Sequence, residues 1–180
     1  DFSASVVPRF ESIDNYFTQE IGDGHNRLTM LKLAGLLHDI AKPATKTVED
    51  SGKIRFLGHH RDGAEMAENI LTRLRFSGKW INLVNTMVES HLRPGQMSNK
   101  GAMPTSRAIY RYYRDVGEAA IDTLYLNMAD YLAARGPFLE KEEWIDYCAT
   151  IRHILKGRPS PSEEKSKTNL IDGHDIMKIF

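Results

Sequence analysis

Helical periodicity dominates this sequence and restricts the folds open to it more than any other feature. Apolar residues recur at three- and four-residue spacing through most of the chain, which indicates amphipathic helices that bury their apolar faces against one another. Glycines and prolines interrupt these runs and limit their length. The pattern predicts an all-α helical bundle, with helices over residues 11–21, 26–42, 61–76, 79–92, 105–117, 118–136 and 140–156.

Two segments depart from the helical pattern. Residues 44–58 carry β-branched side chains on either side of the turn signal Glu-Asp-Ser-Gly at 49–52. That arrangement is typical of two short strands joined by a tight turn, so we expect a small β-hairpin or an extended insertion near 44–58. Residues 93–104 contain two prolines and two glycines, and there we expect a loop.

The length of 180 residues fits a single domain with a short tail. We expect a helical domain over residues 1–156, a linker rich in proline, serine and charge over 157–169, and the start of a further helical segment over 170–180. The chain begins without methionine and stops shortly after Asp172, a favourable helix-capping residue. We therefore expect it to be a fragment of a longer polypeptide.

Charge and cysteine content narrow the function classes. Lysine and arginine number 24, and aspartate and glutamate also number 24, so bulk charge gives no argument for a nucleic-acid ligand and any such argument depends on local patches. The single cysteine, Cys148, excludes a disulfide within the chain. No apolar run is long enough for a membrane span, and the first residues do not form a signal peptide. These features predict a cytoplasmic protein.

An ionisable pair interrupts an apolar run at residues 33–41. Leu33, Ala34, Leu36, Leu37, Ile40 and Ala41 fit the inner face of a buried helix, whereas His38 and Asp39 do not. A buried carboxylate is costly unless it is paired or bound to a metal. Other histidines and aspartates also lie among apolar residues, namely His59 or its neighbour His60, His91 and Asp130. Taken alone, each of them fits an ordinary position at the boundary of the core. Together, mixed imidazole and carboxylate groups suit a divalent metal ion.

The motif "LLHDIAKP" resembles the signature of the HD superfamily of metal-dependent phosphohydrolases, which is named for its His-Asp doublet and is all-helical. The resemblance implies a divalent metal ion, with manganese, nickel, cobalt, zinc, iron and magnesium as alternatives. "FLGHHRDGAE", "ESHLRPG" and "MADYLAARG" resemble later segments of that family. On these motifs the implied metal ligands are His38, Asp39, Asp130 and His59, and the implied catalytic residues are Asp39, Lys42, His59 and His91.

Longer segments resemble a narrower group. "HDIAKPATKT", "ESHLRPGQM" and "RAIYRYYRDVGEAAIDTLYLNMADYLAARGP" are similar to the HD region of bacterial transfer-RNA nucleotidyltransferases and poly(A) polymerase-like proteins, and "LIDGHDIMKIF" is similar to the start of their C-terminal RNA-binding part. The resemblance implies a nucleotidyltransferase head N-terminal to this region in the full-length protein. It also implies a metal-ligating histidine upstream of the doublet. His25 lies closer to the doublet than the family usually places that ligand, so we expect the ligand before residue 1 or absent.

These observations predict a phosphohydrolase that acts on a phosphomonoester, a cyclic phosphate or a phosphodiester, including one at an RNA end. A divalent ion held by Asp39 and Asp130 would activate water and polarise a phosphoryl oxygen. Lys42, His59 and His91 would stabilise charge on the phosphoryl oxygens or protonate the leaving group. Two other interpretations remain: an RNA-binding neck with a vestigial metal site, and a regulatory nucleotide-binding domain with little turnover.

A basic stripe supports contact with RNA. Arg107, Arg111 and Arg114 have helical spacing on one face, and tyrosines lie among them at 110, 112 and 113. Arginine next to aromatic rings suits phosphate contact and base stacking. A solvated helix face with tyrosines at its edge explains the same pattern. Arg93 extends the predicted phosphate-binding set, which also contains Arg107, Arg111 and Arg114.

Overall fold

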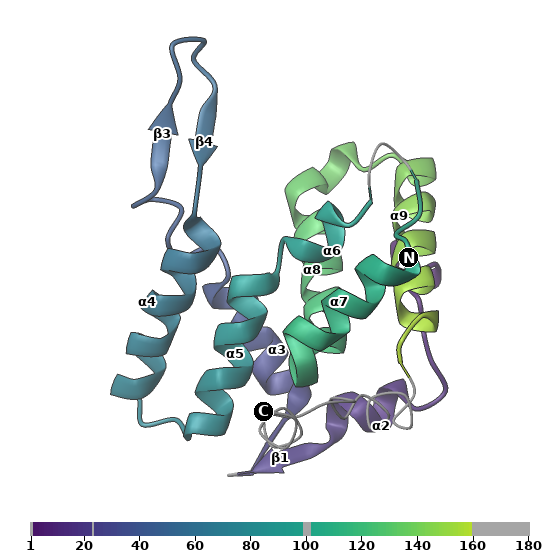
Figure 1. The fold of residues 1–180 in the computed structure, drawn as a ribbon. Helices are drawn as coiled ribbons and strands as arrows, with labels where there is room; N and C mark the ends of the chain where they lie inside the picture. Colours follow the sequence, from purple (N-terminus) through teal and green to yellow (C-terminus); the bar gives the residue numbers. More distant parts are fainter. Residues whose placement is uncertain (1, 23, 99–101, 160–180) are drawn as a thin grey trace, which may run out of the picture.

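The computed structural model describes residues 2–22, 24–98 and 102–159 (Figure 1). Within these residues the chain is an all-α bundle with two small antiparallel hairpins, which confirms the predicted fold class. The predicted C-terminal segment over 170–180 and most of the predicted linker lie outside the described residues. None of the described helices is both long and apolar enough to cross a lipid bilayer.

The helices are α1 (Phe2–Ser5), α2 (Ile13–Thr18), α3 (Arg27–Leu37), α4 (His59–Arg73), α5 (Gly78–Ser90), α6 (Arg93–Gln96), α7 (Ser106–Val116), α8 (Ala120–Arg135) and α9 (Lys141–Lys156). Short 3₁₀ turns, η1 (Gly117–Ala119) and η2 (Gly136–Phe138), border α8 at its two ends. The strands are β1 (Glu20–Gly22), β2 (His25–Asn26), β3 (Lys46–Val48) and β4 (Ile54–Phe56).

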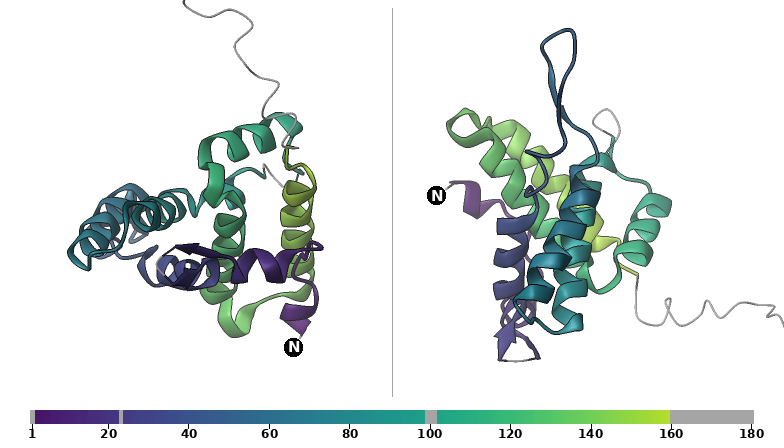
Figure 2. Two further views of the ribbon diagram at one scale, coloured as in Figure 1. Left: turned by 90° about the horizontal axis from the view of Figure 1, so that it is seen from below. Right: turned by 90° about the vertical axis from the view of Figure 1, so that its left-hand side faces the viewer.

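The core lies where α5 packs between α3, α4 and α8 (Figures 1 and 2). Its most buried large side chains include Trp80 and Met87 of α5, Met30 of α3 and Leu71 of α4. On the other side of α8, helix α9 buries Trp144, whose indole Nε1 donates to the carbonyl oxygen of Ser3 at 3.0 Å. The apolar faces predicted by the helical periodicity thus meet in one core. The C-terminal ends of α3 and α5 and the N-terminal end of α4 come together beside Asp130 of α8.

The hairpin β3–β4 confirms the prediction for residues 44–58. Its strands pair antiparallel, with Lys46 opposite Phe56 and Val48 opposite Ile54, and the hairpin extends away from the helical bundle (Figures 1 and 2). Gly58 ends this insertion with a φ of 82°, a left-handed conformation that glycine adopts without the penalty of a side chain. This turn places His59 at the first position of α4.

The C-terminal end of α3 and the segment that precedes α3 differ from the sequence prediction. The predicted helix over 11–21 ends at Thr18, and its last residues form β1, which pairs with β2 and leads into α3. Asn26 caps α3, since its side chain accepts a hydrogen bond from the backbone N–H of Thr29 at 3.0 Å. At the other end, α3 stops at Leu37 rather than at residue 42, and hydrogen bonds from Ile40 N to Leu37 O and from Lys42 N to Asp39 O tighten the following turns.

Two further predictions were wrong in detail. Leu36 is 78% exposed rather than inward-facing, because the buried face of α3 consists of Met30, Ala34 and Leu37. The predicted loop over 93–104 begins with a helical turn, α6, which has a proline near its start where the missing N–H costs nothing.

Candidate metal centre

Four helices deliver the ionisable residues of the centre. His38 and Asp39 follow the last residue of α3, His59 is the first residue of α4, His91 follows the last residue of α5, and Asp130 lies in α8. Because α3, α4, α5 and α8 pack around one core, these positions lie close together although up to 92 residues of sequence separate them. The doublet lies beyond the regular turns of α3, so its two side chains are not held to the fixed angle between successive helical residues.

The three imidazoles are oriented in the same way. Each Nδ1 lies close to the backbone carbonyl oxygen three residues earlier: 2.8 Å for His38 to Gly35, 2.7 Å for His59 to Phe56 and 2.7 Å for His91 to Val88. When Nδ1 donates its proton to such a carbonyl, Nε2 carries the free lone pair. This is the arrangement in which metal-ligating histidines are held by their surroundings, because it fixes the tautomer and the ring orientation.

Asp39 is at the centre of the cluster. Its Oδ1 lies 3.5 Å from His59 Nε2 and 3.9 Å from His91 Nε2, whereas its Oδ2 lies 3.3 Å from His38 Nε2. The ammonium of Lys42 pairs with Oδ2 at 2.5 Å and also lies over the ring of Phe56. Asp130 completes the cluster from α8, with Oδ1 3.5 Å from His38 Nε2.

The electrostatics of the cluster favour a positive charge at its middle. Burial lowers the pKa of His38, but the contacts with Asp130 and Asp39 outweigh it and raise that pKa to about 10. Burial raises the pKa of Asp39, and His38 and Lys42 more than compensate, so the net shift is downward. Without a metal ion, the His38 imidazolium and the Lys42 ammonium together therefore balance the charges of the two carboxylates. A divalent ion that bound there would take the place of that proton.

His91 has the opposite environment. Its side chain is fully buried, and burial lowers its pKa to about 4 although the carbonyl oxygen of Val88 favours the protonated ring. His91 is therefore neutral at physiological pH, and its Nε2 offers a lone pair rather than a proton.

The cluster has more hydrogen-bond acceptors than donors, and a bound cation would compensate for this excess of lone pairs. His59 Nε2 and His91 Nε2 face each other at 3.3 Å, although both rings have a carbonyl oxygen at Nδ1. Asp39 Oδ1 is buried and has no hydrogen-bond partner among the described residues, and His38 Nε2 meets the carboxylates of Asp39 and Asp130 at the long distances of 3.3 and 3.5 Å. The potential ligand atoms form two groups that share Asp39, namely Asp39–His59–His91 and His38–Asp39–Asp130, each within 4.8 Å. Imidazole nitrogens with carboxylate oxygens suit divalent transition metals, so the residues present fit such an ion.

Some predicted residues lie elsewhere. His25 is in β2, at the opposite end of α3 from the doublet and about 15 Å away by the rise of the helix, so it is not part of the cluster. His59, rather than His60, faces the other ligands. Two of the predicted phosphate-binding arginines, Arg93 and Arg114, both pair with Asp115.

The arginines on α7 are exposed. Exposure is expected both for a face that contacts RNA and for an ordinary solvated helix face. Arg107, Arg111 and Arg114 all point away from the core. The tyrosines between them differ, because Tyr112 and Tyr113 are buried and donate hydrogen bonds to the carbonyl oxygens of Ala120 and Ile154. These two rings are core residues and are not available to stack on a base.

Sequence reasoning missed two features. One is a buried ion pair between Arg27 and Asp122, joined by the hydroxyl of Tyr16. The other is an aromatic stack of Tyr131 and Tyr147 beside Asp130. The sequence places Tyr131 directly after Asp130, which is the one hint of the stack. Tyr147 shows no pattern that distinguishes it from other residues of its helix.

Comparisons with known proteins agree with this geometry. The chain matches the family model of the HD domain over residues 16–135. It is 32% identical over 151 residues to the CC-adding tRNA nucleotidyltransferase of Thermus thermophilus, and 29% identical over 152 residues to the A-adding tRNA nucleotidyltransferase of Deinococcus radiodurans. These alignments cover 83% and 84% of this chain but 31% and 33% of the two relatives, so the chain spans about a third of their length. With four packed helices carrying the His-Asp doublet, its partner histidines and the distant aspartate, the chain belongs to the HD domain family.

Proposed function

We propose that this domain is a metal-dependent phosphohydrolase acting on a phosphomonoester, a cyclic phosphate or a phosphodiester, as part of a tRNA nucleotidyltransferase-like protein. The observation that carries the proposal is the convergence of three similarly anchored imidazoles on Asp39 and Asp130. Membership of the HD family supports the reaction class. The names of the relatives support an RNA end as one form of the substrate.

The ligands that we assign to the ion are His38, Asp39, Asp130 and His59. When bound, a divalent ion lowers the pKa of a water ligand and polarises a phosphoryl oxygen. Asp39 and Asp130, which approach the cluster from α3 and α8, hold and orient the attacking water as hydrogen-bond acceptors. The backbone carbonyls behind the histidines keep the three rings in place during the reaction.

Lys42 and His91 differ in what they contribute. The Lys42 side chain is 38% exposed and lies beside Asp39, so its ammonium orients that carboxylate and can contact a phosphoryl oxygen from the solvent side. Buried His91 is neutral, so we assign its Nε2 a supplementary ligand position beside the four ligands named above, rather than protonation of the leaving group. This assignment refines the wider role that the sequence suggested for His91.

Turnover by the purified chain tests the proposal. We expect phosphate release from glycerol 2-phosphate, or ring opening of adenosine 2′,3′-cyclic phosphate, after loading with at least one of manganese, cobalt, nickel, zinc, iron or magnesium. The activity should disappear with a chelator and return with the metal. If no ion supports turnover of a monoester, a cyclic phosphate or a diester, the hydrolase proposal is wrong.

The exposed face of α7 supports a second function, contact with RNA. Arg107 and Arg111 have no ion-pair partner within the described part of the chain, so their guanidinium groups are open to phosphates. We assign Arg107, Arg111, Arg114 and Arg93 to RNA or phosphate contact, with tRNA as the proposed partner and a nucleotidyltransferase head in the full-length protein. The cytoplasmic location expected from the sequence stays a prediction.

Removing the two unpaired arginines tests this contact. Arg107→Ala/Arg111→Ala should weaken binding of tRNA and lower the slope of log affinity against log salt by about 1.5, since each lost phosphate contact removes roughly 0.7 to 0.9. The measurement is filter binding or fluorescence anisotropy at several salt concentrations. As a control, Arg9→Ala/Lys53→Ala removes the same charge elsewhere on the surface. Equal losses in both double variants would show that only net charge matters.

A further inference from the structure

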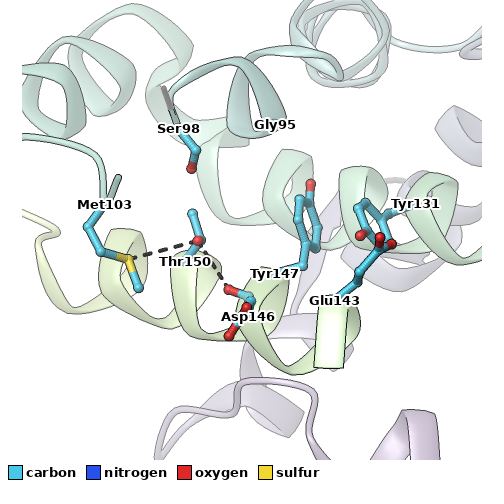
Figure 3. Close-up of a pocket in the computed structure, with 8 residues that line it drawn as sticks. All are labelled: Gly95, Ser98, Met103, Tyr131, Glu143, Asp146, Tyr147 and Thr150. Atoms are coloured by element: carbon cyan, nitrogen blue, oxygen red, sulfur yellow. Dashed lines mark hydrogen bonds between the residues drawn. The ribbon is translucent and has the colours of Figure 1, made fainter. Parts of the chain in front are cut away.

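A groove leads away from the metal centre between α6, α8 and α9. Its inner part is a cavity of about 330 Å³ lined by Asp130, Asn127 and Arg135, among others. It adjoins a second cavity of about 500 Å³ (Figure 3). Gly95, Tyr131 and Tyr147 line both cavities, which therefore lie next to each other between Asp130, a predicted metal ligand, and the surface of α9. Each volume lies in the range of small-molecule sites.

The wall of the groove is a stack of flat groups. The rings of Tyr131 and Tyr147 lie parallel, with centroids 3.9 Å apart and 18° between their planes. The guanidinium of Arg135 lies 3.4 Å from the centroid of Tyr131. Two groups this close cannot share one face of a ring, so Arg135 and Tyr147 cover opposite faces of Tyr131. The stack can therefore be extended only beyond Tyr147.

Space for another ring exists on that side. In Figure 3, Tyr147 lies between Tyr131 and the end of the cavity formed by Ser98, Met103 and Thr150. The hydroxyl of Tyr147 donates to Asn127 Oδ1, which fixes the ring in place. Gly95 lies opposite Tyr147. A Cβ at this position would be in van der Waals contact with the Tyr147 hydroxyl, at 3.7 Å, and would occupy part of the space there.

The charges along the groove favour one orientation of a ligand that carries a phosphoryl group. Asp146 lines the part of the groove next to Thr150, and a carboxylate there repels phosphate (Figure 3). Glu143 lies beside Tyr131 and pairs with Arg135, so its charge is already balanced by a cation. At the other end, Asp130 belongs to the cluster whose residues fit a divalent cation. A ligand with a flat ring and a phosphoryl group therefore fits in one orientation, with its ring at Tyr147 and its phosphoryl group at the cluster.

We propose that this groove is a nucleobase subsite, in which the base of a nucleoside phosphate stacks on Tyr147 while its phosphoryl group lies at the His-Asp cluster. The proposal rests on the proposed function for the position of the phosphoryl group, and on the Tyr131–Tyr147 stack for the base. Stacking on an aromatic ring accepts every base, because each base has a π-face. The ligand class is thus a nucleoside monophosphate, either free or at the end of an RNA.

Variants of Tyr147 test the subsite without any turnover. Binding of adenosine, which has no phosphate, is measured by NMR titration of the chelator-treated chain. Tyr147→Leu should weaken it about tenfold or more, because base–aromatic stacking is lost. Tyr147→Phe keeps the ring and should bind like the parent. The control is Ile145→Ala, which changes an exposed residue on the same helix.

A second variant guards against misfolding of Tyr147→Leu. Thr150→Phe fills the cavity and leaves the tyrosine stack unchanged, so it should also abolish adenosine binding while the melting temperature stays near that of the parent. In the metal-loaded chain, Tyr147→Leu should raise the KM for adenosine 2′-monophosphate by a much larger factor than the KM for glycerol 2-phosphate, which has no base. Competition with adenosine then distinguishes the two sources of the ligand. If a trinucleotide RNA with a 3′-phosphate competes more strongly than adenosine 2′-monophosphate, the subsite binds an RNA end. If adenosine 2′-monophosphate competes more strongly, the subsite binds a free nucleotide.

The outcomes separate this inference from the proposed function. Adenosine binding that depends on Tyr147 in a chain without turnover would support the subsite and contradict the hydrolase. Turnover of glycerol 2-phosphate in a chain that does not bind adenosine would do the opposite. Binding that is equal in the parent, Tyr147→Leu and Thr150→Phe would overturn the subsite.

Discussion

Asp130→Ala will reduce metal-dependent turnover of phosphate esters by roughly a thousandfold or more, the loss expected when charge stabilisation worth several kcal/mol is removed. Asp130 contributes a carboxylate from α8, and its Oδ1 lies 3.5 Å from His38 Nε2. Its removal leaves the ligands of one group incomplete. The measurement is kcat/KM for glycerol 2-phosphate or adenosine 2′,3′-cyclic phosphate with the best metal.

The control for this variant is Asp50→Ala. Asp50 is an exposed carboxylate in the turn of the β3–β4 hairpin, so its loss removes the same charge without touching the cluster. Asp130 is itself half-buried, and the melting temperature of Asp130→Ala should remain close to that of the parent. Turnover within a fewfold of the parent in a folded Asp130→Ala chain would show that this carboxylate does not hold the ion.

Asp122→Leu will destabilise the fold by about 3 to 5 kcal/mol, because it leaves the guanidinium of Arg27 buried without its main counter-charge. Asp122 is fully buried and Arg27 is 5% exposed, and their side chains meet at 2.5 Å. Tyr16 donates to the same carboxylate oxygen at 2.7 Å, and Glu118 pairs with the other end of the guanidinium. The free energy of unfolding is measured by urea denaturation.

A double variant separates the cost of an unpaired charge from the value of the pair. Arg27→Met/Asp122→Leu removes both charges and should recover a large part of the loss, since apolar groups often replace a buried ion pair without penalty. The matched surface control is Glu49→Gln, which breaks the exposed pair between Glu49 and Arg55 and should cost less than about 1 kcal/mol. Additive losses in the double variant would contradict this account of the pair.

The sequence predicted the architecture because the relevant information is local. The three- and four-residue periodicity of 79–92 and 140–156 matches α5 and α9, and the turn at 49–52 matches the β3–β4 hairpin. Helix ends were less accurate. Pro43 suggested that the helix begun near residue 26 ends at 42, but tighter hydrogen bonds replace the regular ones after Leu37. The β1–β2 hairpin was missed because its strands, of three and two residues, are too short to show a periodicity.

Contacts between helices could not be derived from periodicity. We predicted one metal site from the doublet, His59, His91 and Asp130 because their motifs resemble those of a family. The spacing of these residues along the sequence does not by itself predict that they are close in space. The groove had no such signal. Tyr131 and Tyr147 stack because α8 and α9 lie side by side, and their spacing within each helix is that of ordinary half-buried residues. The same is true of Arg27 and Asp122, which are 95 residues apart.

Metal content tests the central claim most directly. The chain and its Asp39→Ala variant would be purified without chelator or a nickel column and then compared by elemental analysis. Asp39 belongs to both groups of potential ligands, so its loss should remove the ion from either one. We expect about one or more equivalents of a divalent metal per parent chain and none in the variant. No metal in either protein, even after soaking with manganese, cobalt and zinc, would contradict the assignment of this cluster as a metal centre.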